Sequence, residues 1–165
     1  MSLPLDWRPA PLQGLLHGRP LLRPEHVLLR APVVDLPQAF SAIGHLVEQP
    51  RGPSAPEMAD RLLRREARRT TVIGHGIALP HAQVPRLRAP VAAYLRPLQP
   101  IALADGGGPP VRDILALLVP KPAAVPHFQL LERLAQLLRD PTLGRELARC
   151  QSVLDVCRLF ALHGQ

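Results

Sequence analysis

Apolar residues recur along this chain in short segments, and their spacing predicts a sheet built from several strands. Residues 114–119 form an unbroken apolar run, which is typical of a strand covered on both faces. Residues 91–98 and 26–31 are further segments with strand character. Residues 77–79 form a short apolar strand that ends at a proline, which has no N–H for a sheet ladder. The pattern therefore predicts strands at four places.

Helical segments are marked by polar residues that can cap a first turn. Asp35 precedes apolar residues at helical spacing that continue to about residue 48. Ser54 and Glu57 have the spacing of a capping box, in which each side chain accepts from the other residue's backbone N–H, and their helix runs to about residue 68. Three more helices are expected over residues 126–138, over residues 141–149, and after Ser152 with Asp155 at the capping-box spacing.

Strands and helices in this order predict an α/β fold, in which a central mixed β-sheet is sandwiched between α-helices. Residues 21–165 contain no linker long enough to separate two domains, so we expect a single domain there. Residues 1–20 carry prolines and glycines without hydrophobic periodicity. We expect them to form an extended N-terminal arm that adds little to the core.

The composition is typical of a soluble globular protein. Of the 165 residues, 47% are apolar and 20% are charged. No run of about 20 apolar residues could span a membrane, and the start of the chain lacks the basic and apolar regions of a secretory signal. We therefore expect a cytoplasmic protein with no membrane insertion.

A net charge of +7 is a feature of many proteins that bind nucleic acids. Here the positive charge is almost all arginine, with Lys121 the only lysine, and most of the arginines are scattered. The one local cluster, residues 61–69, shortly precedes a glycine-rich motif. These features favour a basic docking face, or the codon bias of a GC-rich genome, and predict no nucleic-acid partner.

Metal and nucleotide sites are not expected. Cys150 and Cys157 match neither a metal-ligand spacing nor a redox pair, so they are expected to be buried apolar residues. His81 and His127 lack the third and fourth ligands that zinc requires. The glycine-rich segment 104–110 lacks the Gly-Lys-Ser/Thr of a phosphate-binding loop. No cofactor is predicted.

The glycine-rich motif, residues 74–82, reads Gly-His-Gly-Ile-Ala-Leu-Pro-His-Ala. Because Pro80 ends an apolar strand, we expect His81 just past a strand end, on a rigid turn open to solvent. The unperturbed pKa of an imidazole is near 6.5, so a histidine here is available as a neutral nucleophile at neutral pH. A solvated loop histidine without a chemical role fits the same spacing, so the surrounding sequence has to separate the two interpretations.

Five segments in a fixed order resemble the type-2 EIIA domains of the bacterial phosphotransferase system. These domains include the fructose and mannitol proteins and the nitrogen-related regulator. One segment alone would not be specific, but five in the right order are, and the resemblance extends from about Leu22 to Leu162. The matching segments are Leu22–Leu29, the pair Arg65-Glu66, residues 74–82, residues 111–120 and His127–Leu131.

The resemblance implies that His81 accepts a phosphoryl group from a small carrier protein. His127 matches a second active-site histidine that stabilises charge on the phosphoryl oxygens. Arg65 matches an arginine that contacts phosphate, for which a planar guanidinium is well suited. Without the family pattern, His127 is also explained as a polar residue opening a helix, and Arg65 as a solvated helix arginine. The supporting residues implied by the match are Thr70, Thr71, Gly74, Gly76 and Pro80.

Three positions depart from the family pattern. The family usually has glycine near Arg69 and at Val72, and commonly has asparagine at His75. We expect these changes to stiffen the loop that enters the motif. His75 precedes the predicted strand, so we expect His81 rather than His75 to be the phosphoryl acceptor.

The resemblance implies a phosphocarrier of a phosphoenolpyruvate-dependent phosphotransferase system, close to the nitrogen-regulatory branch. Its phosphoryl donor would be a histidine carrier protein of the HPr type, and its phosphorylation state would regulate target proteins. One alternative is the soluble EIIA component of a fructose- or mannitol-type uptake system, whose partner is an EIIB component. Another is a binding module that has lost phosphotransfer.

Overall fold

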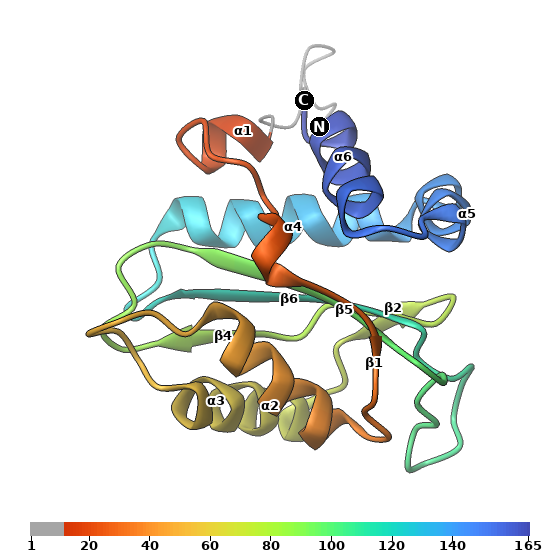
Figure 1. Ribbon diagram of the computed structural model, residues 1–165. Helices are drawn as coiled ribbons and strands as arrows, with labels where there is room; N and C mark the ends of the chain where they lie inside the picture. The colour runs from red at the N-terminus through yellow and green to blue at the C-terminus, as the bar shows by residue number, and fades with distance from the viewer. Residues whose placement is uncertain (1–11) are drawn as a thin grey trace, which may run out of the picture.

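The computed structural model of the protein describes residues 12–165, which form a six-stranded sheet between two layers of helices (Figure 1). The predicted α/β fold with a central mixed sheet is confirmed. The strands are β1 (Val27–Ala31), β2 (Val72–Gly74), β3 (Ile77–Ala78), β4 (His81–Val84), β5 (Val91–Pro97) and β6 (Asp113–Pro120). The helices are α1 (Leu12–Leu15), a 3-10 helix η1 (Pro24–His26), α2 (Leu36–Val47), α3 (Ala55–Arg68), α4 (Val125–Arg139), α5 (Pro141–Arg149) and α6 (Val153–His163).

Strand β6, the long apolar run of the sequence, lies inside the sheet. The strand order is β1-β5-β6-β3-β2, and β4 also pairs with β6. β6 is antiparallel to β5 and parallel to both β3 and β4, and β1 is parallel to β5. Because β5 occupies one side of β6, β3 and β4 follow one another along its other side. β4 is therefore an edge strand.

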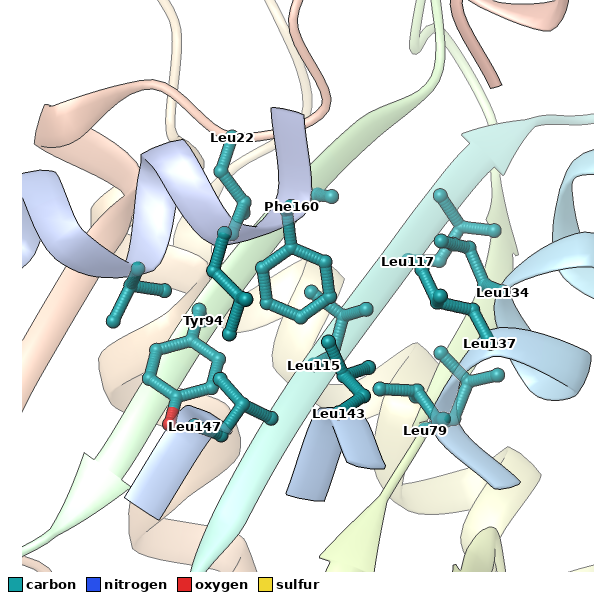
Figure 2. Packing of buried hydrophobic residues seen from close by; sticks show 14 of the residues in the cluster. Leu22, Leu79, Tyr94, Leu115, Leu117, Leu134, Leu137, Leu143, Leu147 and Phe160 are labelled. Carbon is teal, nitrogen blue, oxygen red and sulfur yellow. The ribbon is translucent and has the colours of Figure 1, made fainter. Parts of the chain in front are cut away.

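Alternation along β6 sends its side chains into two separate cores, one on each face of the sheet. Leu115, Leu117 and Val119 pack with α4, α5 and α6, as Figure 2 shows for the first two beside Leu134 and Phe160. The intervening side chains pack with α2 and α3 on the opposite face; they are Ile114, Ala116 and Leu118. Burial of β6 on both faces explains its continuous apolar sequence.

The predicted helix caps are present. Asp35 accepts a hydrogen bond from the Gln38 N–H at 2.8 Å, and Ser152 accepts one from the Asp155 N–H at 3.1 Å. At the start of α3, Ser54 accepts from the Glu57 N–H at 3.3 Å, but the Glu57 carboxylate does not complete the capping box. Instead it pairs with Arg86 at 2.6 Å.

The sequence did not predict strands β2 and β4. The prediction that the chain leaves the sheet at Pro80 is wrong. Ile77 pairs with Asp113 and His81 with Leu117, so the register along β6 is the same on both sides of Pro80. The carbonyl of Pro80 still accepts from the Leu117 N–H at 2.9 Å. An edge strand tolerates the missing proline donor, so His81 opens β4 and does not lie on a turn beyond the sheet.

Both cysteines pack in the core between the sheet and helices α4–α6, as predicted from their lack of partners. Cys150 is 8% exposed, and Cys157 on α6 is half-buried against the same cluster.

A buried polar network joins strands β5 and β6 to the end of α5. Arg96 donates to the Asp113 carboxylate at 3.1 Å and to the carbonyl oxygens of Leu147 and Cys150 at 2.6 and 2.7 Å. Tyr94 donates its hydroxyl to Asp113, and burial together with that carboxylate raises the pKa of the tyrosine. This network supplies a donor to the Cys150 carbonyl just past the end of α5, and a second donor to the Leu147 carbonyl, which also accepts from the Cys150 N–H at 3.0 Å.

The expected N-terminal arm is not extended where the structure describes it. Residues 12–15 form α1, which Figure 1 shows above α4, and Leu12 is only 2% exposed. Leu12 lies beside Gly164 near the end of the chain and belongs to the same core as α4–α6. The prediction of a segment that adds little to the core is therefore wrong for this part, and residues 1–11 lie outside the described residues.

Replacing Leu12 tests this correction. We expect Leu12→Ala to lower the free energy of unfolding by about 2–5 kcal/mol, because it removes a fully buried side chain and leaves a cavity. Leu162→Ala is the matched control: that leucine is 72% exposed, and its loss should change the stability by less than about 0.5 kcal/mol. Urea unfolding measures both variants. Equal stability of the two would show that α1 is not part of the core.

Candidate phosphoryl-transfer site

A hollow of about 540 Å³ lies at the sheet edge formed by β4, between α3 on one face and the first turns of α4 on the other. It contains three of the residues predicted from the sequence, His81, His127 and Arg65. The three come from β4, α4 and α3, which lie far apart in the sequence. Its other charged lining residues are Arg61, Arg64, Arg68 and Lys121.

His81 is half-buried, and a hydrogen bond fixes its ring. Ala82 and Val84 point to the α2–α3 core, so alternation along β4 directs His81 to the α4 side. The Nδ1 atom lies 2.9 Å from the carbonyl oxygen of Leu79. A carbonyl can only accept, so Nδ1 carries the proton. The Nε2 atom is left with a free lone pair, as a nucleophile requires.

The Leu79 carbonyl is itself held in place through α3. The Leu79 N–H donates to the carbonyl of Thr71 at 2.9 Å. Thr71 is buried, and its N–H donates to the Glu66 carboxylate at 3.0 Å, while its hydroxyl donates to the same carboxylate. A chain of hydrogen bonds thus runs from α3 to the imidazole of His81. The sequence identified Glu66 only as half of the Arg65-Glu66 pair. It did not predict that the Glu66 carboxylate holds Thr71 in place.

Burial is the main cause that lowers the pKa of His81, because it disfavours the charged imidazolium. The hydrogen bond to Leu79 acts in the opposite direction, the positive charge of Arg65 lowers the pKa further, and Glu66 raises it. The net direction is downward, so the neutral imidazole predominates at neutral pH and persists as the pH falls toward the ordinary histidine value.

His127 presents the opposite tautomer. Its Nδ1 atom accepts the N–H of Ala124 at 2.9 Å, which satisfies a free donor at the start of α4. The proton of the neutral ring must then lie on Nε2, which makes that nitrogen a hydrogen-bond donor. The hollow therefore combines a histidine with a free lone pair and a second histidine with an N–H to donate.

Positive charge surrounds the two histidines. Arg65 is half-buried, and its Nη1 donates to the carbonyl of Arg69 at 3.0 Å, at the end of α3. Arg64 is exposed and paired with Asp60 at 2.7 Å. Among residues 12–165, none of the residues that line the hollow is acidic. The arrangement suits a group that carries negative charge.

The remaining predicted residues shape the site without lining the hollow. Thr70 is exposed and accepts from the Val72 N–H at 3.2 Å, and Thr71 acts through its backbone as described above. Gly76 has φ +75°, and a Cβ there would lie 2.8 Å from the carbonyl oxygen of Pro110. Gly74 also has a positive φ, +140°, and Pro80 is buried immediately before His81.

The three departures from the family pattern fit the observed backbone. Arg69 has φ −166°, which any residue adopts, and Val72 opens strand β2, so neither position requires glycine. His75 has φ +54°, a left-handed conformation in which asparagine and histidine are both enriched. It lies in the turn before Ile77. His81 follows Ile77 by four residues, which places it about 13 Å beyond Ile77 at 3.3 Å per residue. His75 is not among the residues of the hollow.

Comparison with known proteins decides the family. The sequence model described as phosphoenolpyruvate-dependent sugar phosphotransferase system, EIIA 2, matches residues 20–162. This chain belongs to that EIIA family. A nitrogen regulatory protein of Bradyrhizobium diazoefficiens is 30% identical over 142 residues, which cover 86% of this chain and 93% of the relative. A fructose-specific EIIA component of Haloferax volcanii is 30% identical over 102 residues, covering 62% of this chain and 66% of that protein.

Solved EIIA structures share the fold. The nitrogen regulatory protein IIA-Ntr from Neisseria meningitidis superposes with a TM-score of 0.76 at 27% identity, over 85% of this chain and 96% of that one. The mannitol IIA of Escherichia coli superposes with a TM-score of 0.68 at 20% identity, over 84% and 98% of the two chains. The second likeness supports the EIIA fold alone.

Two further features bear on the other predictions. Across residues 12–165, no three histidine, cysteine or carboxylate side chains are grouped as metal ligands would be. None of the helices in that part of the chain is both long enough and apolar enough to cross a bilayer.

Proposed function

We propose that this EIIA protein is a cytoplasmic phosphocarrier in which Nε2 of His81 accepts a phosphoryl group from the phosphohistidine of an HPr-type carrier. In the transfer, the bond between phosphorus and the donor imidazole breaks and a bond to Nε2 of His81 forms. The proton on Nδ1 of His81 stays on that nitrogen, hydrogen-bonded to the Leu79 carbonyl. The phosphoryl group therefore moves directly from one imidazole nitrogen to another.

The observation that carries this proposal is the pair of opposite tautomers in one positively charged hollow. Phosphoryl transfer passes through a loose transition state with charge on the equatorial oxygens. His127 supplies an N–H donor for those oxygens, and Arg65 supplies a guanidinium once it leaves the Arg69 carbonyl. The His127 donor is already oriented by its bond to the Ala124 N–H and needs little rearrangement during the reaction, which is the main way a protein lowers such a barrier.

Regulation is the role that the relatives favour. The Bradyrhizobium diazoefficiens protein and the Neisseria meningitidis structure are both named as nitrogen regulatory proteins. We propose that the phosphorylation state of His81 likewise determines which target proteins this chain binds. The alternative is transfer onward to an EIIB component. A solved structure of the mannitol IIA of Escherichia coli contains it in complex with phosphorylated IIB. That structure matches the fold of this chain with a TM-score of 0.67, which supports the alternative.

Reconstituted phosphotransfer tests the proposal. The protein is mixed with radiolabelled phosphoenolpyruvate, enzyme I and an HPr-type carrier, and each component is omitted in turn. We expect label on this chain only in the complete mixture, stable in base and lost in acid, as a phosphoramidate is. Failure to take up label from an active carrier would instead identify a binding module that has lost phosphotransfer.

Arg65 should have a smaller effect than either histidine. We expect Arg65→Ala to slow labelling by about tenfold or less, since one charge-assisted hydrogen bond contributes about 1.5–3 kcal/mol and its neighbours on α3 can partly replace it. Arg69→Ala is the matched control, because the Arg69 side chain is exposed and does not line the hollow. Initial labelling rates compare the two. A larger loss for the Arg69 variant would contradict the placement of Arg65 at the phosphoryl group.

A further inference from the structure

A second hollow, of about 530 Å³, lies on the other side of His127. It is bounded by the segment between α1 and η1, by the loop from β4 to β5, and by the start of α4. Apolar side chains from α1, β5 and β6 line part of it, including Leu15, Val91 and Leu117. Its volume is within the range of small-molecule sites in proteins.

The polar lining of this second hollow is cationic. Arg19 and Arg23 come from the segment before η1, and Arg88 comes from the loop between β4 and β5. Arg23 lies 3.8 Å from Glu25, with both side chains exposed, whereas Arg19 and Arg88 form no ion pair within residues 12–165. Among those residues, no acidic side chain lines the hollow. Such an arrangement favours a ligand with negative charge.

His26 adds a buried polar group to the same wall. It is 8% exposed, and it lines the hollow. Burial is the main cause that lowers the pKa of His26; Glu25 opposes that effect and Arg23 adds to it. Because this imidazole has little access to water, a ligand in the hollow that hydrogen-bonds to it would satisfy a largely desolvated polar group.

We propose that this second hollow binds a small organic anion with two or more negative charges, held by Arg19, Arg23, Arg88 and His26. The apolar lining accommodates the uncharged part of the molecule. Carboxylates and phosphate esters share this chemistry, and either can supply the charge. Because His127 lines both hollows, a bound anion lies next to the imidazole proposed to stabilise the phosphoryl group. The protein would then respond to a small metabolite as well as to its phosphoryl donor.

Direct binding to the unphosphorylated full-length protein tests this site independently of phosphotransfer. Citrate and fructose 1,6-bisphosphate serve as the carboxylate and phosphate-ester probes in isothermal titration calorimetry. Fructose and sodium chloride at matched ionic strength are the uncharged and ionic controls. We expect at least one probe to bind and to raise the melting temperature, and neither control to do so. Which probe binds more tightly distinguishes the two ligand chemistries.

Variants then locate the binding. Arg88→Gln changes an exposed loop residue and should weaken the binding of the preferred probe at least tenfold, as should His26→Gln. Arg61→Gln, in the hollow of His81, should change that affinity by less than twofold. Absence of binding by both probes would overturn the proposal. So would a tenfold loss in Arg61→Gln with none in Arg88→Gln, since that result would place the anion in the His81 hollow.

Discussion

His81→Ala is expected to abolish labelling of the protein from phosphoenolpyruvate. The Nδ1 proton is committed to the Leu79 carbonyl, so Nε2 of His81 is the ring nitrogen with a free lone pair in the hollow. Alanine offers no nucleophile, and His127 has its own Nδ1 occupied by the Ala124 N–H. Labelling is followed in the reconstituted system after alkaline treatment, which leaves a phosphoramidate intact.

His75→Ala is the matched control for this prediction. It removes the other histidine of the glycine-rich motif, which lies in the turn before β3 and outside the hollow. We expect this variant to label at close to the rate of the unaltered protein. Label that survives in His81→Ala, or that disappears only in His75→Ala, would move the acceptor and overturn the assignment.

His127→Ala is expected to slow labelling by about 10²–10³-fold, which is the usual effect of removing one oriented donor to a developing charge. The substitution also removes the hydrogen bond that His127 accepts from the Ala124 N–H at the start of α4. A loss of activity in this variant could therefore reflect either the missing donor or a frayed helix. Initial rates of phosphotransfer measure the combined effect.

His127→Glu separates those two contributions. A glutamate at the third position of a helix can accept the same backbone N–H, so α4 should keep its cap and the protein its melting temperature. It cannot donate to a phosphoryl oxygen and adds negative charge, so labelling should be at least as slow as in His127→Ala. Rapid labelling of a stable His127→Glu protein would show that His127 serves the helix alone.

Features that depend on neighbouring residues could be predicted from the sequence. Asp35, Ser54 and Ser152 cap helices through backbone groups three residues away, and each cap is present in the structure. The continuous apolar run of β6 likewise carries its own evidence of burial on both faces. In these places the sequence within a few positions determines the conformation.

Features that depend on residues far away in the sequence could not be predicted. The continuation of the strand through Pro80 is decided by Leu117, and the burial of Leu12 by residues at the other end of the chain. Arg96 finds its carbonyl acceptors 51 and 54 residues later. No local sequence pattern predicts these contacts, because each forms only when distant segments of the chain pack together.

The candidate site shows the same division. The family resemblance predicted His81, His127 and Arg65 as residues of the site. It did not predict the tautomers of the two histidines, because each tautomer depends on which backbone group hydrogen-bonds to Nδ1. The match implied Thr71 as a supporting residue without saying how it acts; in the structure its carbonyl accepts from the Leu79 N–H and its hydroxyl donates to Glu66.

The unbroken register of β3 and β4 along β6 restricts the length of the segment from Gly76 to His81 more strictly than its composition. Side chains alternate between the two faces, so inserting or deleting a single residue there would turn His81 toward the α2–α3 core. Its imidazole would then be separated from His127 by the sheet itself. Substitutions in this segment cost packing energy, whereas a change of one in its length would remove the acceptor from the reaction altogether.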